Sequence, residues 1–263
     1  MSGMFLAGFV CALFVGIVLG LLGGGGSILS IPILVYLFGL DPVIASAYSL
    51  FIVGVTSLVG AVPKYREHLV NVKTAILFGI PSIVAIFSTR RWIVPSLPEV
   101  FFTEPFVLTK RLVLLGLFAL LMVLAALTMI RKRNEDTEPH RYRTFLVMVE
   151  GLLIGLLTGL VGAGGGFLII PALVLLTGLP FKTAVGTSLF IIAINSLLGF
   201  AGDVLNYDID WPFLLSVTAV AVVGIFVGSW LTPHFRGSSL RKAFGWLTLA
   251  MGIFILLRET VFL

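Results

Sequence analysis

Residues 16–61 read GIVLGLLGGGGSILSIPILVYLFGLDPVIASAYSLFIVGVTSLVGA, and residues 155–200 read GLLTGLVGAGGGFLIIPALVLLTGLPFKTAVGTSLFIIAINSLLGF. Aligned without a gap at an offset of 139, the two stretches agree at 22 of 46 positions. The agreement extends beyond Leu to Gly, Pro and Ser, as in Pro32/Pro171, Ser49/Ser188 and Ser57/Ser196. The chain is therefore an internal duplication, and each copy carries a glycine run inside a long apolar stretch.

The composition indicates a membrane protein. Of 263 residues, 59% are hydrophobic and 11% are charged, whereas soluble domains are about 25% charged. The N-terminal segment lacks the basic flank and cleavage site of a signal peptide, so we expect it to be retained. A single cysteine, Cys11, excludes a disulfide framework and a Cys-rich metal site. We expect no metal, cofactor or catalytic residue, and we assign the basic pI to loops that contact lipid headgroups rather than to nucleic-acid binding.

Apolar segments recur along the whole chain. They fall at about 5–22, 27–38, 43–62, 73–89, 111–130, 144–161, 167–178, 182–201, 211–231 and 241–257. A helix needs about 20 residues to cross the hydrocarbon core, with a minimum near 17. Segments 27–38 and 167–178 are too short, and both follow the glycine runs. Each is predicted to be half a helix, paired with the preceding segment in a broken or re-entrant hairpin.

The distribution of Arg and Lys orients the chain. Loops 63–73, 131–143, 179–182 and 232–242 hold 12 of the 17 basic residues. Cytoplasmic loops are enriched in Arg and Lys, so we place these loops in the cytoplasm. The outer side then holds Arg90, Arg91, Lys110, Arg111 and Arg258, together with a loop containing Asp203, Asp208 and Asp210. Four of the basic residues lie in 90–111, which is the weakest point of this assignment.

Equivalent loops of the two copies carry opposite charge. Loop 63–73 is basic, whereas its counterpart 202–210 has three Asp and no Arg or Lys. The sequence therefore predicts an all-α polytopic protein with two inverted repeats of about five helical segments. Residues 1–130 form the first repeat, 131–143 a cytoplasmic linker and 144–263 the second repeat. A parallel duplication is the alternative, and it would have placed like charges in matching loops.

The glycine runs are the first candidate for a binding site. Each Gly in a helix interior costs about 0.8–1.0 kcal/mol relative to Ala, and broken backbone in a membrane persists only inside protein or beside a wet cavity. A short helix follows each run, so several N–H groups and a positive dipole converge on one point that suits an anion. The residues are Gly24, Gly25, Gly26 and Ser27 in the first copy and Gly164, Gly165 and Gly166 in the second. The GxxxG pairs Gly16/Gly20 and Gly155/Gly159 are expected only to allow close helix packing.

Polar side chains of the third segment in each copy are further candidates. Ser49, Thr56 and Ser57 share one helical face, and they match Ser188, Asn195 and Ser196, with Thr187 replacing Tyr48. Ser49, Thr187, Ser188 and Asn195 are proposed to complete the hydrogen-bond shell of an anion. Interhelical hydrogen bonding is the alternative role.

Glu150 is the one ionisable side chain that we find well inside an apolar segment. Such acids often carry protons in transporters, so Glu150 is a candidate for coupling. Snorkelling or pairing with Arg143 is the alternative.

The run Gly159-Leu-Val-Gly-Ala-Gly-Gly-Gly-Phe-Leu-Ile-Ile-Pro171, echoed by Gly20 to Pro32 and followed by Ala184-Val-Gly-Thr-Ser-Leu189, resembles the TauE/SafE family of sulfite exporters. The resemblance covers essentially the whole chain. It implies a secondary carrier of small sulfur-containing anions in the plasma (inner) membrane of a prokaryote. The Phe-rich insert 94–107, absent from the second copy, departs from the pattern and is expected to cap the outer face.

Other functions remain as alternatives. An anion channel could be built from the same two glycine turns. An intramembrane enzyme would need a nucleophile–base pair or metal ligands in the bilayer, and His68, His140 and His234 all fall in or beside loops. The substrate, its direction of movement and homo-oligomerisation are left open by the sequence.

Overall fold

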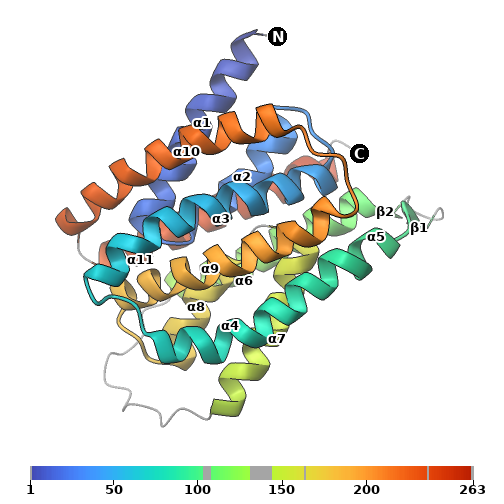
Figure 1. The fold of residues 1–263 in the computed structure, drawn as a ribbon. Coiled ribbons are helices and arrows are strands. Elements are labelled where there is room, and N and C mark those ends of the chain that lie inside the picture. The colour runs from blue at the N-terminus through green and yellow to red at the C-terminus, as the bar shows by residue number, and fades with distance from the viewer. Residues whose placement is uncertain (1, 103–107, 131–143, 163, 236, 262–263) are drawn as a thin grey trace.

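The computed structural model describes residues 2–102, 108–130, 144–162, 164–235 and 237–261, and these residues form a bundle of helices (Figure 1). The first half of the chain contains α1 (Ser2–Leu22), α2 (Gly25–Tyr36), α3 (Pro42–Arg66), α4 (Val72–Ser88), a π-helical turn (Thr89–Ile93), α5 (Val94–Ser96), the hairpin strands β1 (Val100–Phe102) and β2 (Leu108–Thr109), and α6 (Lys110–Ile130). The second contains α7 (Thr144–Val161), α8 (Gly166–Leu176), α9 (Phe181–Val204), α10 (Trp211–Leu231), a 3-10 turn (Thr232–His234) and α11 (Gly237–Val261). The expected linker 131–143 lies outside the described residues.

Seven of the described helices are long and apolar enough to cross a bilayer: α3, α4 with its extension to Ser96, α6, α7, α9, α10 and α11. Their outward faces carry large exposed apolar side chains, such as Phe145 on α7 and Phe226 on α10. All four tryptophans, Trp92, Trp211, Trp230 and Trp246, are also exposed, as expected for side chains at membrane interfaces. The prediction of an all-α polytopic membrane protein is confirmed.

Local sequence determines where several helices begin. Asp41, Asn71 and Asp210 precede α3, α4 and α10, and each side chain accepts a hydrogen bond from a backbone N–H of the first turn. A side-chain oxygen at this position satisfies a donor that has no partner within the helix. Pro42 and Pro212 then occupy the first turn, where a missing N–H carries no penalty.

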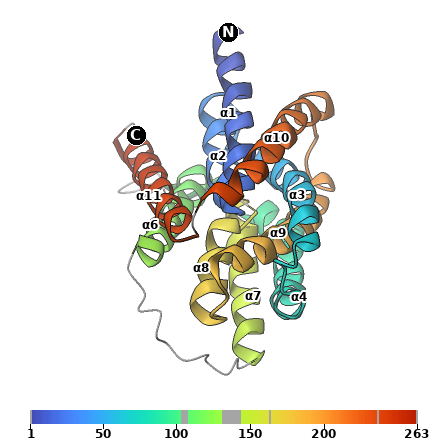
Figure 2. The same cartoon turned by 90° about the vertical axis from the view of Figure 1, so that its left-hand side faces the viewer.

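Helices from the two halves of the chain are interleaved. Helix α1 packs along α10 and α7 packs along α4, while α3 and α9 lie against each other, as do α6 and α11. Figures 1 and 2 show α1 and α7 reaching the centre of the bundle from opposite ends. Each of these long contacts therefore joins one half of the chain to the other.

Glycines on α1 and α7 allow the close contacts with α10 and α4. A methyl group added at Gly20 would lie 2.6 Å from the Ile225 carbonyl oxygen, and one at Gly155 would lie 2.5 Å from that of Ser82. Real Cβ atoms do not approach other atoms so closely. The GxxxG glycines thus serve helix packing, as predicted.

The fourth segment differs from the prediction. Residues 90–96 were assigned to an outer loop, but they continue α4 through a π-helical turn and then α5. Arg90 is fully buried in this extension, and Asp203, assigned to the outer loop 202–210, lies in α9 and is also fully buried. The two side chains form an ion pair of 3.5 Å. Each charge compensates the other, which is why both helices extend further than hydropathy alone indicates.

Candidate functional site

Two glycine turns lie in the interior of the bundle. In the first, Gly23 has a φ of +72° and precedes α2; in the second, Gly162, Gly164 and Gly165 have φ of +81°, +65° and +72° and precede α8. Such angles suit glycine because it has no Cβ. The helices that follow begin at Gly25 and Gly166, and the first N–H groups of a helix have no acceptor within it. Each turn therefore presents free donors at a helix N-terminus.

The two turns touch each other. A methyl group added at Gly166 would lie 2.5 Å from the Gly24 Cα, and one added at Gly24 would lie 2.5 Å from the Gly166 carbonyl carbon. Both glycines are buried. The structure thus brings the N-terminal ends of α2 and α8, which are 141 residues apart in sequence, to one buried point (Figure 2).

Polar side chains without hydrogen-bond partners are concentrated in the helices that carry and surround these turns. Among the described residues, five hydroxyl or amide oxygens on α3, α7 and α9 are buried and have no hydrogen-bond partner: Ser49 Oγ, Ser57 Oγ, Thr158 Oγ1, Asn195 Oδ1 and Ser196 Oγ. Two of them lie directly against the second turn. A methyl group at Gly164 would be 2.8 Å from Ser196 Oγ, and one at Gly165 would be 2.5 Å from Thr158 Oγ1. An unpaired buried hydroxyl costs about 1–3 kcal/mol, and these oxygens are free to form hydrogen bonds with a polar ligand.

Other predicted ligands are engaged with the protein. Ser27 Oγ donates to the Gly24 carbonyl at 2.6 Å, and Ser188 Oγ donates to that of Val185 at 2.8 Å. Thr187 Oγ1 donates to the Thr183 carbonyl and accepts the Asn71 N–H, which joins α9 to the start of α4. Asn195 Nδ2 donates to Ser82 Oγ at 2.6 Å, which leaves its Oδ1 free. Of the predicted side chains, Ser49 and Asn195 therefore keep an oxygen for a ligand.

Glu150 is partly buried in α7. Its Oε2 has no hydrogen-bond partner, and no ion pair involves it within the described residues. Arg143, its alternative partner, lies outside those residues.

Sequence reasoning missed the ion pair of Arg90 and Asp203, because it treated Glu150 as the only buried charge. Arg90 Nη1 also donates to Ser46 Oγ at 2.8 Å, and the guanidinium lies against Gly162 of the second turn. Nearby Tyr207 lies in the loop before α10, where burial and the Asp203 carboxylate raise its pKa. One signal in the sequence was overlooked: at the offset of 139, Asp203 corresponds to Lys64, so equivalent positions carry opposite charges.

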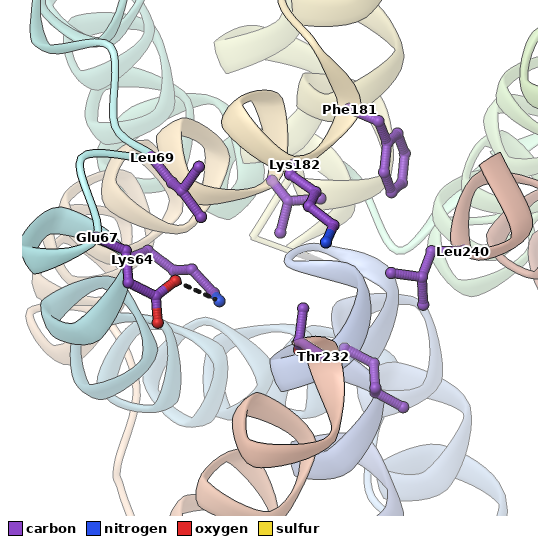
Figure 3. Close-up of a pocket in the computed structure, with 9 residues that line it drawn as sticks. Lys64, Glu67, Leu69, Phe181, Lys182, Thr232 and Leu240 are labelled. Atoms are coloured by element: carbon purple, nitrogen blue, oxygen red, sulfur yellow. Dashed lines mark hydrogen bonds and ion pairs between the residues drawn. The ribbon is translucent and has the colours of Figure 1, made fainter. Parts of the chain in front are cut away.

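A pocket of about 280 Å³ opens beside the first turn. It is lined by Leu21, Lys64, Glu67, Leu69, Phe181, Lys182, Val185, Thr232 and Leu240. Figure 3 shows Lys64 and Lys182 extending toward it from different elements, with Lys64 bound to Glu67 at 3.1 Å. Val185 also packs on Gly23, since a methyl group there would lie 2.5 Å from Val185 Cγ1. Val185 thus separates the pocket from the first glycine turn.

The sequence model of the sulfite exporter TauE/SafE family matches residues 8–255. The chain belongs to this family. A relative from Xylella fastidiosa (strain 9a5c), named "Probable membrane transporter protein", is 30% identical over 93% of this chain and 92% of its own length. The "Probable membrane transporter protein YunE" of Bacillus subtilis is 28% identical over 84% of this chain and 85% of its own length.

A plant relative, "Sulfite exporter TauE/SafE family protein 6" of Arabidopsis thaliana, is 27% identical over 38% of this chain and 24% of its own length. No solved structure matches the TauE/SafE chain. The TauE/SafE family is one of membrane transporters and not of enzymes. With seven helices able to span a bilayer in the described part of the chain and prokaryotic relatives that are membrane transporters, the protein is a multi-pass transporter of the plasma membrane.

Proposed function

We propose that the protein is a secondary transporter of small sulfur-containing anions, such as sulfite, thiosulfate or an organosulfonate, bound between the two glycine turns near the bilayer midplane. The observation that carries the proposal is the contact of Gly24 with Gly166, which joins two helix N-termini at one buried point. Helix N-termini attract anions through free N–H groups and the helix dipole. The unpaired hydroxyls of Thr158 and Ser196 beside the second turn supply neutral donors to the same ligand.

Contacts between helices support two inverted repeats, 1–130 and 144–263. With the offset of 139, α1 against α10 corresponds to α7 against α4, and α3 against α10 corresponds to α9 against α4. Individual residues follow the same rule: Gly16 faces Ala221, and Gly155 faces Ser82. In Figure 1 the loop after α3 lies at the left and the loop after α9 at the right, so equivalent helices run in opposite directions. Transporters with this symmetry bind substrate at the interface of the repeats.

Ion pairs support the proposed orientation, in which loop 63–73 is cytoplasmic. Three of the four basic residues of 90–111 are neutralised: Arg90 by Asp203, Lys110 by Glu99 at 3.5 Å, and Arg111 by Glu259 at 3.1 Å. The remaining one, Arg91, donates to Asn206 Oδ1 at 2.5 Å. Basic residues that are paired within the protein need no contact with anionic lipids. The four basic residues of 90–111 therefore no longer argue against an outer location for this segment.

A pocket opens beside the site on one side of the protein, whereas the equivalent position on the other side is closed, which supports a carrier rather than a channel. On the proposed cytoplasmic side, the pocket beside Gly23 has Leu21 and Lys182 in its wall. At the equivalent positions on the other side, Leu160 and Val43 join Val94, Leu97, Leu114 and Tyr207 in an apolar cluster. One entrance is open while its counterpart is filled, as alternating access requires.

Glu150 is proposed as the coupling residue because it is partly buried and without an ion-pair partner among the described residues. If it carries a proton, Glu150→Gln abolishes the dependence of uptake on an imposed pH gradient and leaves exchange of labelled anion intact. Equal pH-gradient dependence in both proteins would remove Glu150 from the coupling mechanism.

Flux into proteoliposomes tests the function. We expect uptake of labelled sulfite, thiosulfate or sulfoacetate that saturates with concentration and is accelerated by the same anion on the opposite side. Uptake that grows linearly with concentration and carries a steady current would identify an anion channel instead. Empty liposomes and protein with Gly166→Ala serve as controls. No flux of any sulfur-containing anion, with transport of carboxylates, would contradict the proposed substrate class.

A further inference from the structure

Of the three guanidinium nitrogens of Arg90, only Nη1 has a polar partner among the described residues. Its side chain is fully buried; Nη1 donates to Ser46 Oγ at 2.8 Å and lies 3.5 Å from Asp203 Oδ2. Nε and Nη2 have no hydrogen-bond partner among the described residues. These two nitrogens form one edge of the planar guanidinium, and that edge matches two oxygens of an oxyanion. A buried charged donor without a partner is expensive, so the edge needs a ligand.

One nitrogen of this edge, Nη2, lies against the second glycine turn. Nη2 occupies the space where a side chain on Gly162 would begin, and Ser46 fills the rest of that space. Gly162 has a φ of +81°, so the backbone conformation and the contact both require glycine. Arg90 itself lies in the π-helical turn that ends α4, and such turns are frequent at functional sites.

The first glycine turn has no equivalent cation. At the offset of 139, Arg90 corresponds to Ser229 and Ser46 corresponds to Val185. Accordingly, the neighbour of Gly23 is the apolar Val185. Thr158, which lies beside Gly165, corresponds to Leu19, which lies beside Gly26. The two glycine turns lie at equivalent positions in the sequence, but the polar groups are gathered around the second turn.

We propose that Arg90 is the cationic ligand of the transported anion and binds two of its oxygens through the Nε–Nη2 edge. Ser46 and Asp203 are positioning residues, which hold the guanidinium through Nη1. This inference rests on the proposed function and specifies the class of ligand that the site binds. That ligand is an oxyanion with two oxygens on one face, as in sulfite, a sulfonate or a carboxylate. A halide of the same charge cannot use both nitrogens equally well and is bound more weakly.

Binding to the purified full-length protein in detergent tests the inference. The probes are sulfite, thiosulfate and sulfoacetate, with chloride at equal ionic strength, measured by calorimetric titration. Arg90→Lys keeps the positive charge but removes the two parallel N–H donors of the guanidinium. Oxyanion affinity is therefore expected to fall on the order of 10- to 100-fold, while chloride affinity changes little. Arg91→Lys is the matched control, because Arg91 bonds to Asn206, and it leaves affinity unchanged.

A second variant separates a ligand from a structural ion pair. Asp203→Asn removes the charge that neutralises Arg90, so oxyanion affinity rises by roughly 10-fold, and the anion restores the thermal stability that the variant loses. A purely structural pair would lose stability without any gain in affinity. The affinity of Asp203→Asn also tests the role of Arg90 if the Arg90→Lys variant does not fold.

The outcomes separate the inference from the function on which it rests. Wild-type binding together with unchanged oxyanion affinity in folded Arg90→Lys, or with no gain in Asp203→Asn, would overturn the role of Arg90 alone. Failure of the wild-type protein to bind or transport any of the oxyanions would overturn the proposed function and this inference with it.

Discussion

A methyl group at Gly166 is the sharpest perturbation of the contact between the glycine turns. Gly166 is the first residue of α8 and has no positive φ, so alanine introduces no backbone strain there. Its Cβ would lie 2.5 Å from Gly24 Cα and 2.7 Å from Ile192 Cδ1. The Ile192 methyl can rotate away, but Gly24 Cα belongs to the opposite turn. To reach an ordinary contact of about 3.5–4.0 Å between carbons, the two turns must separate by roughly 1 Å or more.

Two effects are expected from this separation. Overpacking of a buried contact costs about 1–3 kcal/mol of stability. Moving one turn by about 1 Å also removes at least one charge-assisted hydrogen bond to the anion, worth about 1.5–3 kcal/mol, so affinity falls on the order of 10- to 100-fold. Calorimetric titration with sulfite and thermal unfolding in detergent measure the two effects separately.

Gly79→Ala is the matched control. Gly79 is a buried helical glycine of α4, and a methyl group there would meet nothing within 4 Å. Alanine is favoured over glycine inside a helix by about 0.8–1.0 kcal/mol, so this variant is expected to be slightly more stable with unchanged affinity. If Gly166→Ala is as stable as Gly79→Ala and binds anion equally well, the two turns do not form the site.

Three further predictions follow from the orientation, the hydroxyls and the pocket. After replacement of Cys11, a cysteine at exposed Asp208 reacts with an impermeant thiol reagent added outside intact cells, whereas one at exposed Arg66 is protected; labelling of both from one side would refute the inverted repeats. Ser196→Ala removes an unpaired buried hydroxyl, so affinity falls by roughly 10-fold with no loss of thermal stability; a large loss of stability would mean that Ser196 serves packing instead. Lys182→Gln removes a charge from the pocket, so anion entry from that side slows several-fold at low salt and little at high salt; equal slowing at both ionic strengths would contradict electrostatic attraction.

Much of the architecture follows from the sequence because it rests on local properties. Length and hydropathy predicted the membrane-spanning helices, and Asp41, Asn71 and Asp210 determine where three helices begin. The glycine runs predicted two breaks in helices, since consecutive glycines are costly inside a helix and several of these adopt positive φ. The spacing of Gly16 and Gly20 likewise predicted close packing without naming the partner helix.

Which side chains come together at the site depended on the tertiary structure. Hydropathy assigned Arg90 and Asp203 to loops, because each is unfavourable in a membrane when considered alone. Folding places them 3.5 Å apart, where each compensates the other, and this pairing spans 113 residues that no local pattern connects. Similarly, Ser27 and Ser49 are both serines within apolar segments, and the sequence makes both of them candidate ligands. In the structure Ser27 Oγ donates to the Gly24 carbonyl, whereas Ser49 Oγ has no hydrogen-bond partner among the described residues. The sequence thus determined which segments are helical and where they break, because those properties depend on near neighbours, whereas only the packing of distant helices decided which polar groups stay unpaired beside the turns.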